Sequence, residues 1–454
     1  MQKILDMKNQ IPLMKFLVLF LAITWIMPAY SQISVGGTPP SFSFENRNEQ
    51  LMSEINLPID FDLDALRAED ANRHKEGKPP RLGTIIPVCF TTDNSGEWTT
   101  LPDGQDIWRL SIIAEEAIAI MLYYDKFEIP TGGKLFIYNN DRSQLLGAYT
   151  EANNPTRVEY ATEFVAGDQI ILEYVPLYSE KQDYLESPIY ITGVCYGYNN
   201  LFTAKTEDGK TTVDVRAAGP CNVNVNCPEG NNWQDQKRGV ARTTQRLGNS
   251  TYFCSGTVVN NAAGDLEPLF LTAYHCYFEG GAEANYSQTT FRFNYESPSC
   301  SNASVPTNQT LTGATKLVAI PVSGSADGML LRITSDIPAS YNVFYNGWDR
   351  RNVAATSGVS IHHPDGDIKK ISTFTSPATS SSFQGPSGSA WRVVWVQTQT
   401  NHGVTEGGSS GSPLFNQDQR VVGTLSGGNA SCTNQNGYDV YSKVWFHWNQ
   451  HGTQ

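Results

Sequence analysis

Positive charge and histidine are both scarce in this sequence. Of its 454 residues only 7 are histidine, and 32 Lys and Arg stand against 45 Asp and Glu, which gives a net charge of -13. Neither half of the chain contains a basic stripe with interleaved aromatic residues, the pattern typical of a surface that binds nucleic acid. We therefore expect no nucleic-acid partner.

Long hydrophobic runs are also few. The apolar run Phe16 to Met27 follows Lys15, and it is shorter than the roughly 20 apolar residues that span a bilayer, which disfavours a membrane anchor. Ala29 and Ser31 are small residues at the positions that a signal peptidase reads. The pattern predicts a signal peptide over residues 1–31, cleaved before Gln32, and a secreted protein with no membrane span in its mature form.

The familiar metal-binding spacings are missing as well. Eight cysteines are present, but the segment CNVNVNC at residues 221–227 has the wrong spacing for a zinc site, and no Cys-x-x-Cys pair accompanies it. An even number of cysteines in an exported chain instead indicates up to four disulfide bridges. We expect neither a metal ion nor another cofactor.

Apolar residues are plentiful, with 40% of the chain hydrophobic and 11% aromatic, which is enough for more than one packed domain. Residues 32–80 are predicted to be a polar connector with a possible short helix, ended by Pro79 and Pro80. Over residues 81–200, segments rich in β-branched and aromatic residues alternate with turn signals, which predicts a compact β-rich domain. Cys89 and Cys195 lie near its two ends, and we expect them to form an internal bridge.

A second strand-rich region follows over residues 217–454. Its clusters of Gly, Asn, Pro and Ser recur at short intervals between apolar segments. This rhythm is typical of a β-barrel or sandwich and not of alternating strands and helices. We therefore expect an all-β protein.

A polar segment, residues 201–216, separates the two β regions and carries Lys205, Lys210 and Arg216. Exposed segments of this kind are preferred sites of proteolytic cleavage. Residues 1–216 contain 18 Lys and Arg against 30 Asp and Glu, a net of -12, whereas residues 217–454 contain 14 against 15, a net of -1. An acidic front region, a cleavable linker and a nearly neutral back region predict a propeptide ahead of a mature protein.

One histidine of the back region is a clear candidate for chemistry. His275 ends the apolar segment PLFLTAYHC, directly before Cys276. A disulfide from Cys276 to Cys254 would hold this turn against a neighbouring strand. A general base needs such a fixed backbone, because a displacement of about 1 Å can reduce the rate on the order of a hundredfold.

The segment GVTEGGSSGSP at residues 403–413 offers a matching nucleophile. Gly408 and Gly411 flank the pair Ser409 and Ser410, and glycine permits a turn tight enough to aim several N–H groups at one point. We expect Ser410 to be the nucleophile, and the amides of Gly408 and Ser410 to form an oxyanion hole.

A third group has to orient the histidine and stabilise its cation. Asp327 lies just before the alternating apolar segment GMLLRI, between His275 and Ser410 in the chain. We favour Asp327 over four other aspartates near turns, namely Asp336, Asp349, Asp365 and Asp367.

Taken together, residues 221–446 resemble the lysyl endopeptidases, secreted bacterial serine proteases with a chymotrypsin-like double β-barrel. The resemblance rests on CNVNVNCPEG, FLTAYHC, NGWDRR, IHHP, GVTEGGSSGSP and GYDVYSKV, which occur in the family's order. It implies a trypsin-like serine protease domain at residues 217–454, acting on protein or peptide substrates with His275, Asp327 and Ser410 as its triad. It also implies three disulfides, namely Cys221–Cys432, Cys227–Cys300 and Cys254–Cys276.

The resemblance also implies a substrate. Asp439, in GYDVYSKV, matches the carboxylate with which the family binds the ammonium group of the lysine before the cleaved bond. A buried carboxylate in an apolar slot favours a cationic side chain, because an unpaired buried charge is costly. Glu406 is a second pocket candidate, since it lies four residues before the expected nucleophile.

The front domain is similar to propeptides of such secreted peptidases, so we expect it to bind the protease domain before activation. The family's usual start implies cleavage after Arg216 and a new N-terminus at Ala217. Lysine-directed self-cleavage would instead follow Lys205 or Lys210. We therefore expect maturation within residues 205–217.

The family pattern is altered near the expected pocket. Ser426 stands where family members can carry a histidine, and Phe383 falls nearest the position of its partner tryptophan. His362 and His363, in IHHP, match the family, and we expect them to be structural. Two alternatives stay open: an active enzyme that prefers arginine or accepts both basic residues, and an inactive protease fold that serves as a binding or adhesion module.

Overall fold

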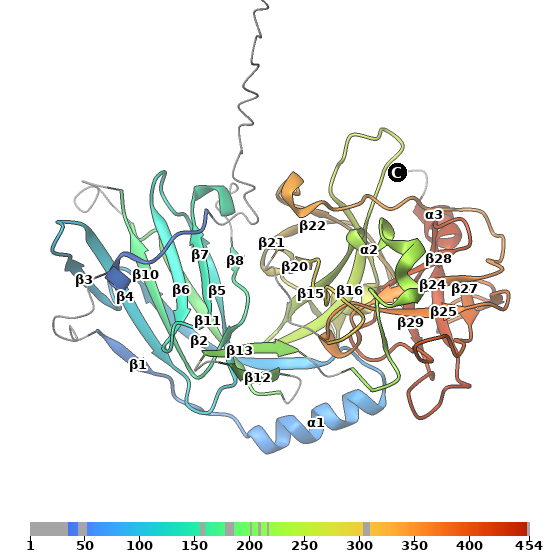
Figure 1. Ribbon diagram of the computed structural model, residues 1–454, viewed down its shortest axis with the longest axis horizontal. Helices are drawn as coiled ribbons and strands as arrows, with labels where there is room; N and C mark the ends of the chain where they lie inside the picture. The colour runs from blue at the N-terminus through green and yellow to red at the C-terminus, as the bar shows by residue number, and fades with distance from the viewer. Residues whose placement is uncertain are drawn as a thin grey trace, which may run out of the picture.

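The computed structural model describes residues 35–43, 52–154, 159–177, 186–199, 202–207, 210–215, 218–302 and 309–451. The expected signal peptide and the expected cleavage point between Arg216 and Ala217 lie outside these residues. In Figure 1 the front region, coloured blue to green, lies on the left, and the back region lies on the right and ends in red. No helix in the described part of the chain is long and apolar enough to cross a membrane.

The front region consists mainly of strands. Its elements are β1 (Glu54–Asn56), α1 (Leu63–Lys75), β2 (Arg81–Thr91), β3 (Glu97–Thr100), β4 (Asp106–Ile113), β5 (Ala119–Phe127), β6 (Lys134–Asn139), β7 (Leu145–Tyr149), β8 (Tyr160–Ala161), β9 (Val165–Ala166), β10 (Gln169–Val175) and β11 (Ile189–Gly197).

These strands form a two-layer sandwich. One sheet has the order β1-β4-β10-β6-β7 with β3 beside β4, and the other layer contains β2, β11 and β5 with β8 and β9. Strand β4 directs Trp108, Leu110 and Ile112 into the core between the layers, because alternate residues of a strand share one face. Leu122 of β5 and Val194 of β11 meet them from the opposite layer.

The expected connector contributes two ordered elements. Strand β1 pairs parallel with β4, and helix α1 begins after Asp62, whose carboxylate accepts the Ala65 N–H at 3.0 Å. The helix ends at Lys75, shortly before Pro79 and Pro80. It lies along the lower side of the molecule in Figure 1. The linker then forms the antiparallel hairpin β12 (Phe202–Glu207) and β13 (Lys210–Val215).

The back region contains the remaining elements. They are β14 (Val223–Asn224), α2 (Gln236–Gly239), β15 (Val240–Leu247), β16 (Ser250–Val259), β17 (Leu269–Thr272), β18 (Phe278–Glu279), β19 (Ala282–Glu283), β20 (Thr290–Phe293), β21 (Gln309–Thr312), β22 (Ala314–Ile320), β23 (Gly328–Ile333), β24 (Gly358–His362), β25 (Lys370–Phe374), β26 (Thr379–Ser381), β27 (Ala390–Val393), β28 (Pro413–Asn416), β29 (Val421–Gly428), β30 (Asp439–Lys443) and α3 (Val444–His451).

Two successive sheets organise this region. In the first, β21, β20, β15 and β16 are neighbours, and β17, β23 and β22 continue from β16; its core includes Phe270, Phe291 and Leu331. The second has the order β14-β25-β24-β28-β29-β30-β27-β26, with Phe374 and Tyr441 in its core. Each sheet therefore encloses a core of its own, and the all-β class expected from the sequence is confirmed.

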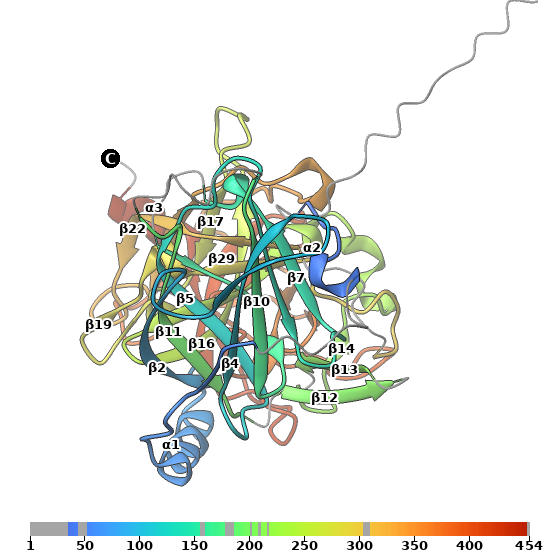
Figure 2. The ribbon, with the colours of Figure 1, turned by 90° about the vertical axis from the view of Figure 1, so that its left-hand side faces the viewer.

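The front and back regions share a sheet. Strand β2 pairs antiparallel with β16, with Thr84 opposite Ser250, so one sheet of twelve strands runs through both regions. Beside this junction the buried Tyr123 hydroxyl lies 2.7 Å from Oγ1 of Thr251. Figure 2 views the molecule from the side of the front region, whose strands β4, β10 and β7 stand before the back region.

The three disulfides implied for the back region are present. They are Cys221–Cys432, Cys227–Cys300 and Cys254–Cys276. The last joins β16 to the short 3-10 turn Tyr274–Cys276.

The prediction of a disulfide bridge in the front region was wrong. Cys89 and Cys195 are both free, one exposed and one buried. They lie on the neighbouring strands β2 and β11, but Cys195 pairs with Ile85, four residues before Cys89. That offset corresponds to about 13 Å along a strand, roughly twice the Cα separation that a disulfide spans. Cys195 instead bonds Thr251 of β16, with 3.3 Å between Sγ and Oγ1.

Candidate active site

The pairing of two strands brings His275 to Asp327. Strand β17 pairs antiparallel with β23, with Thr272 opposite Met329, so the turn that follows β17 lies beside the residue that precedes β23. Nδ1 of His275 is 2.8 Å from Oδ2 of Asp327, and the His275 backbone N–H donates to Oδ1 at 3.0 Å. The two bonds fix both the ring and the backbone of the histidine.

The surroundings of this pair raise the pKa of His275 from its ordinary value of 6.5. Burial is the largest single influence and lowers the pKa, but the charge of Asp327, its hydrogen bond and the charge of Glu279 together outweigh it. Asp327 is fully buried, whereas 20% of the His275 side chain is exposed. The φ of Asp327 is +49°, in the left-handed region that costs energy for a residue other than glycine.

Ser410 lies in the loop before β28, next to the His275 turn. Its carbonyl accepts the Ser255 N–H of β16 at 2.9 Å, and Sγ of Cys276 lies 3.7 Å from the same oxygen. Because Cys276 directly follows His275, these contacts place the two candidate residues side by side. In the described part of the chain the Ser410 hydroxyl makes no hydrogen bond to His275; catalytic hydrogen bonds often form fully only with substrate bound.

The glycines of this loop hold a defined turn. The Glu406 carbonyl accepts the Ser409 N–H at 3.0 Å, and Gly408 has a φ of +84°, as a type II turn requires. The Gly407 carbonyl accepts the Asp365 N–H at 2.5 Å. Because N–H and C=O point in opposite directions across a trans peptide, the Gly408 N–H points away from Asp365.

The neighbouring serine has a different environment. Oγ of Ser409 is 2.8 Å from Nδ1 of His362, and Nε2 of His362 is 3.0 Å from Oγ of Ser372. Burial lowers the pKa of His362 to about 3, so its ring is neutral. His363 is also fully buried, and its Nδ1–H donates to the Asp367 carbonyl at 2.9 Å. His362 therefore holds the loop through Ser409, whereas this bond of His363 stays within its own turn.

Asp439 lies at the start of β30, and its buried carboxylate is next to aromatic side chains. Its Oδ2 accepts from Oγ1 of Thr405 at 2.7 Å and from Nε1 of Trp395 at 2.5 Å. Burial raises the pKa of Asp439 to about 6, although these donors lower it. The Trp395 ring packs edge-on against Phe374 and Tyr441. The carboxylate is thus held in place within mainly apolar surroundings.

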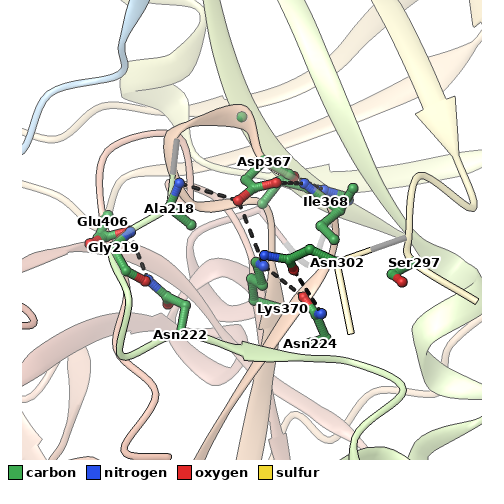
Figure 3. A network of polar contacts seen from close by, with 12 residues as sticks. Ala218, Gly219, Asn222, Asn224, Ser297, Asn302, Asp367, Ile368, Lys370 and Glu406 are labelled. Carbon is green, nitrogen blue, oxygen red and sulfur yellow. Dashed lines mark hydrogen bonds and ion pairs between the residues drawn. The ribbon is translucent and has the colours of Figure 1, made fainter. Parts of the chain in front are cut away.

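Glu406, the second pocket candidate, is engaged elsewhere. Its Oε2 accepts the Gly219 N–H at 3.0 Å and the Asn222 side-chain amide at 2.8 Å. Figure 3 shows this contact beside a second one, in which Asp367 accepts the Ala218 N–H at 3.2 Å. Burial raises the pKa of Glu406 to about 7. The side chain therefore fixes the beginning of the back region.

The sequence reasoning missed two residues of this site. Thr405 and Trp395 both bond Asp439, yet neither was singled out as its partner. Thr405 lies inside GVTEGGSSGSP. A hydroxyl side chain just before the serine loop could have indicated a partner for a pocket carboxylate. Phe383, the residue nearest the position of the family's tryptophan, packs against Gly427. A Cβ atom added to Gly427 would lie 2.8 Å from the Phe383 ring.

Known proteins are similar to this chain in its back region and, in one case, over most of its length. Residues 215–442 match the C-terminal domain of lysyl endopeptidase. A lysyl endopeptidase of Pseudomonas aeruginosa is 29% identical over 383 residues, which covers 79% of this chain and 77% of that protein. Among solved structures, the protease Anisep from Arthrobacter nicotinovorans is 20% identical with a TM-score of 0.34, covering 48% of this chain and 94% of that one. The thermostable serine protease AL20 is 14% identical with a TM-score of 0.33, covering 46% and 92%.

The chain is therefore a serine endopeptidase that acts on proteins or peptides, as the sequence predicted. Because the matching domain spans half of its length, the chain belongs to the lysyl endopeptidase family.

Proposed function

We propose that the chain is a secreted preproenzyme whose mature form hydrolyses peptide bonds after lysine. The observation that carries the specificity is the Asp439 carboxylate, buried beside an aromatic wall and hydrogen-bonded by Thr405 and Trp395. A lysine ammonium would compensate this buried charge, whereas an apolar side chain would leave it unpaired. The raised pKa of Asp439, about 6, still leaves the carboxylate ionised at neutral pH.

The mechanism that we propose is acyl transfer through Ser410. Its Oγ attacks the carbonyl carbon of the lysine while Nε2 of His275 takes the hydroxyl proton, and His275 then gives that proton to the leaving amine. The Asp327 contact at 2.8 Å supports this role, because it holds the proton on Nδ1 and stabilises the imidazolium. The N–H groups of Gly408 and Ser410 would bind the oxyanion. Water then releases the acyl group by the reverse sequence of proton transfers.

The proposed domain organisation follows from the same division of the chain. A signal peptide over residues 1–31 would be followed by a propeptide comprising residues 32–80 and 81–200, by a processing linker at residues 201–216 and by the protease at residues 217–454. The three disulfides of the back region support export, because such bridges persist in oxidising compartments. The pairing of β2 with β16 supports a propeptide bound to its own protease.

One experiment tests this function directly. The mature enzyme is used to digest a denatured protein, and the cleavage sites are read by mass spectrometry. We expect cuts after lysine to dominate, and none with the Ser410→Ala preparation. Equal cutting after arginine would support a pocket that accepts both basic residues. A chain that cuts nothing and resists labelling by a serine-directed phosphonate would be the inactive binding module.

A further inference from the structure

A segment of the front region crosses the back region beside the serine loop. The Pro80 carbonyl accepts the Phe253 N–H of β16 at 3.2 Å, and Arg81 pairs with Tyr252. On the other side, a Cβ placed on Gly407 would lie 2.8 Å from the Lys78 carbonyl oxygen. Residues 78–81 therefore lie in contact both with the loop that precedes Ser410 and with the strand that leads to Cys254.

Under the proposed function, a substrate would place its leaving group on this side of Ser410. The proposed lysine pocket, with Asp439 on β30 and Thr405 beside it, belongs to the second sheet of the back region. A substrate whose lysine enters that pocket has its next residues beyond Ser410, towards the first sheet. They would meet β16 and, beside the first sheet, β18. Residues 80 and 81 bond β16 in this structure, and Arg73 of helix α1 bonds Glu279 of β18.

Cations of the front region occupy an acidic recess on that side. Nη1 of Arg73 lies 2.9 Å from both carboxylate oxygens of Glu279, and its guanidinium stacks 4.5 Å from the centre of the Tyr252 ring. Nζ of Lys78 lies 3.5 Å from Oε1 of Glu279. Only 9% of the Arg73 side chain is exposed, so α1 inserts it deeply between the regions. An open cavity of about 410 Å³ adjoins these residues.

A second acid lies between helix α1 and the serine loop. Asp365 is 4% exposed, and its Oδ2 lies 3.9 Å from Nε2 of His74 on α1. Its other oxygen, Oδ1, is buried and has no hydrogen-bond partner; it lies 3.4 Å from the position of a Cβ on Gly407. An unpaired buried carboxylate oxygen is costly, and a donor from a ligand would relieve that cost.

We propose that Glu279, Asp365 and the Tyr252 ring form a subsite that binds a basic side chain of the substrate within three residues after the cleaved bond. Arg73, His74 and Lys78 occupy it in the precursor, as a substitute for that side chain. Removal of the front region exposes it. The inference rests on the proposed cleavage after lysine, which defines the other side of the cleft.

The test compares arginine and glutamine peptides on the same enzyme preparation, so that each enzyme gives its own ratio of kcat/KM values. The full chain is expressed and allowed to mature, and kcat/KM is measured for quenched peptides with one lysine followed by three alanines. Arginine or glutamine then replaces each alanine in turn. We expect arginine to exceed glutamine by about fivefold at one position, as one partly exposed ion pair with an aromatic contact gives, and the advantage to decrease at high salt. Glu279→Gln should reduce this ratio to about one.

Two further variants separate the possible outcomes. Asp365→Asn keeps the shape of the side chain and tolerates its φ of +48°, and it should also reduce the ratio. Glu283→Gln removes the same charge from the neighbouring strand, where Glu283 pairs with Lys316, and should keep the wild-type ratio. A ratio near one in the wild type, or one that neither Glu279→Gln nor Asp365→Asn reduces, overturns the subsite. Failure to cleave even the all-alanine peptide after lysine would instead refute the proposed function.

Discussion

The front and back regions are both built from β-strands, but they fix their loops in different ways. The front sandwich holds its strands through an apolar core, and its two described cysteines stay free. The back region carries three disulfides, one of which ends directly beside His275. The difference follows from where the chemistry lies. Catalytic groups on loops need restraints that packed strands obtain from their core alone.

Each region also contains a buried carboxylate. The hydrogen-bond partners of the two groups indicate a structural role for one and a functional role for the other. Glu173 of the front region is fully buried and accepts from both the backbone and the hydroxyl of Ser41, and from the Tyr138 hydroxyl. Its partners form a closed network that links residue 41 to the sandwich. Asp439 of the back region lies beside aromatic rings near the serine loop, and burial raises its pKa. We propose a role in substrate recognition for the second only.

Removal of the proposed nucleophile of the back region should have the largest effect. Ser410→Ala is expected to reduce kcat by about 10⁶-fold, and adding His275→Ala should reduce it little further, because the groups act as one unit. Ser409→Ala is the matched control. Its hydroxyl contacts His362, so it should retain most activity. If Ser409→Ala were inactive and Ser410→Ala active, the nucleophile would have been assigned to the wrong serine.

The two buried carboxylates give the next prediction. Asp439→Asn should lower kcat/KM for lysine substrates by about 10² to 10⁴-fold, since the loss of one partner of a buried pair costs about 3–5 kcal/mol. Substrates with an apolar residue before the cleaved bond should change far less. Glu173→Gln is the control, which should affect the yield of folded precursor and leave the ratio of the two substrates unaltered. A preserved lysine preference in Asp439→Asn would move the role to another residue.

Much of this architecture could be predicted from local patterns. The apolar segments of the front region became strands, and the motifs around His275 and Ser410 identified the loops that the structure brings together. Asp327 followed from its place before an alternating strand. These features depend on short stretches of sequence, in which propensity, turn residues and spacing agree with one another.

Non-local pairing could not be predicted in the same way. The register of β2 against β11 separates Cys89 from Cys195, and no property of either cysteine encodes that register. The pairing of β2 with β16 joins residues more than 160 positions apart, and an edge strand does not specify its partner. The contacts of Glu406 could not be predicted for a similar reason, because its partner Gly219 lies at the other end of the back region.

Disulfide removal should affect the two regions unequally. Loss of Cys254–Cys276, by replacing both residues with alanine, is expected to destabilise the back region by about 3 kcal/mol for a loop of this length and to lower kcat by displacing His275. Cys89→Ser removes an exposed free thiol and should change stability by less than about 0.5 kcal/mol. Calorimetry in a Ser410→Ala background, which avoids self-digestion, measures both. Equal effects would show that the bridge does not restrain the active-site turn.

The smallest expected effect concerns Glu406 and the pH. Its pKa is about 7 in the folded chain against 4.5 for the ordinary group, because burial disfavours the charged form. Between these values the folded protein holds a proton that the unfolded chain has lost, so the contribution of Glu406 to stability is constant below about pH 4.5 and falls as the pH rises towards 7. The shift corresponds to at most about 3 kcal/mol, and partial exposure reduces it to about 2 kcal/mol. Glu406→Gln should therefore match the wild type near pH 4.5 and exceed it at pH 8, whereas Glu97→Gln, exposed on β3 of the front region, should parallel the wild type throughout. Thermal unfolding of the Ser410→Ala precursor across this pH range measures the difference. Identical pH profiles for Glu406→Gln and the wild type would mean that the Glu406 carboxyl group has the same pKa in the folded and the unfolded chain.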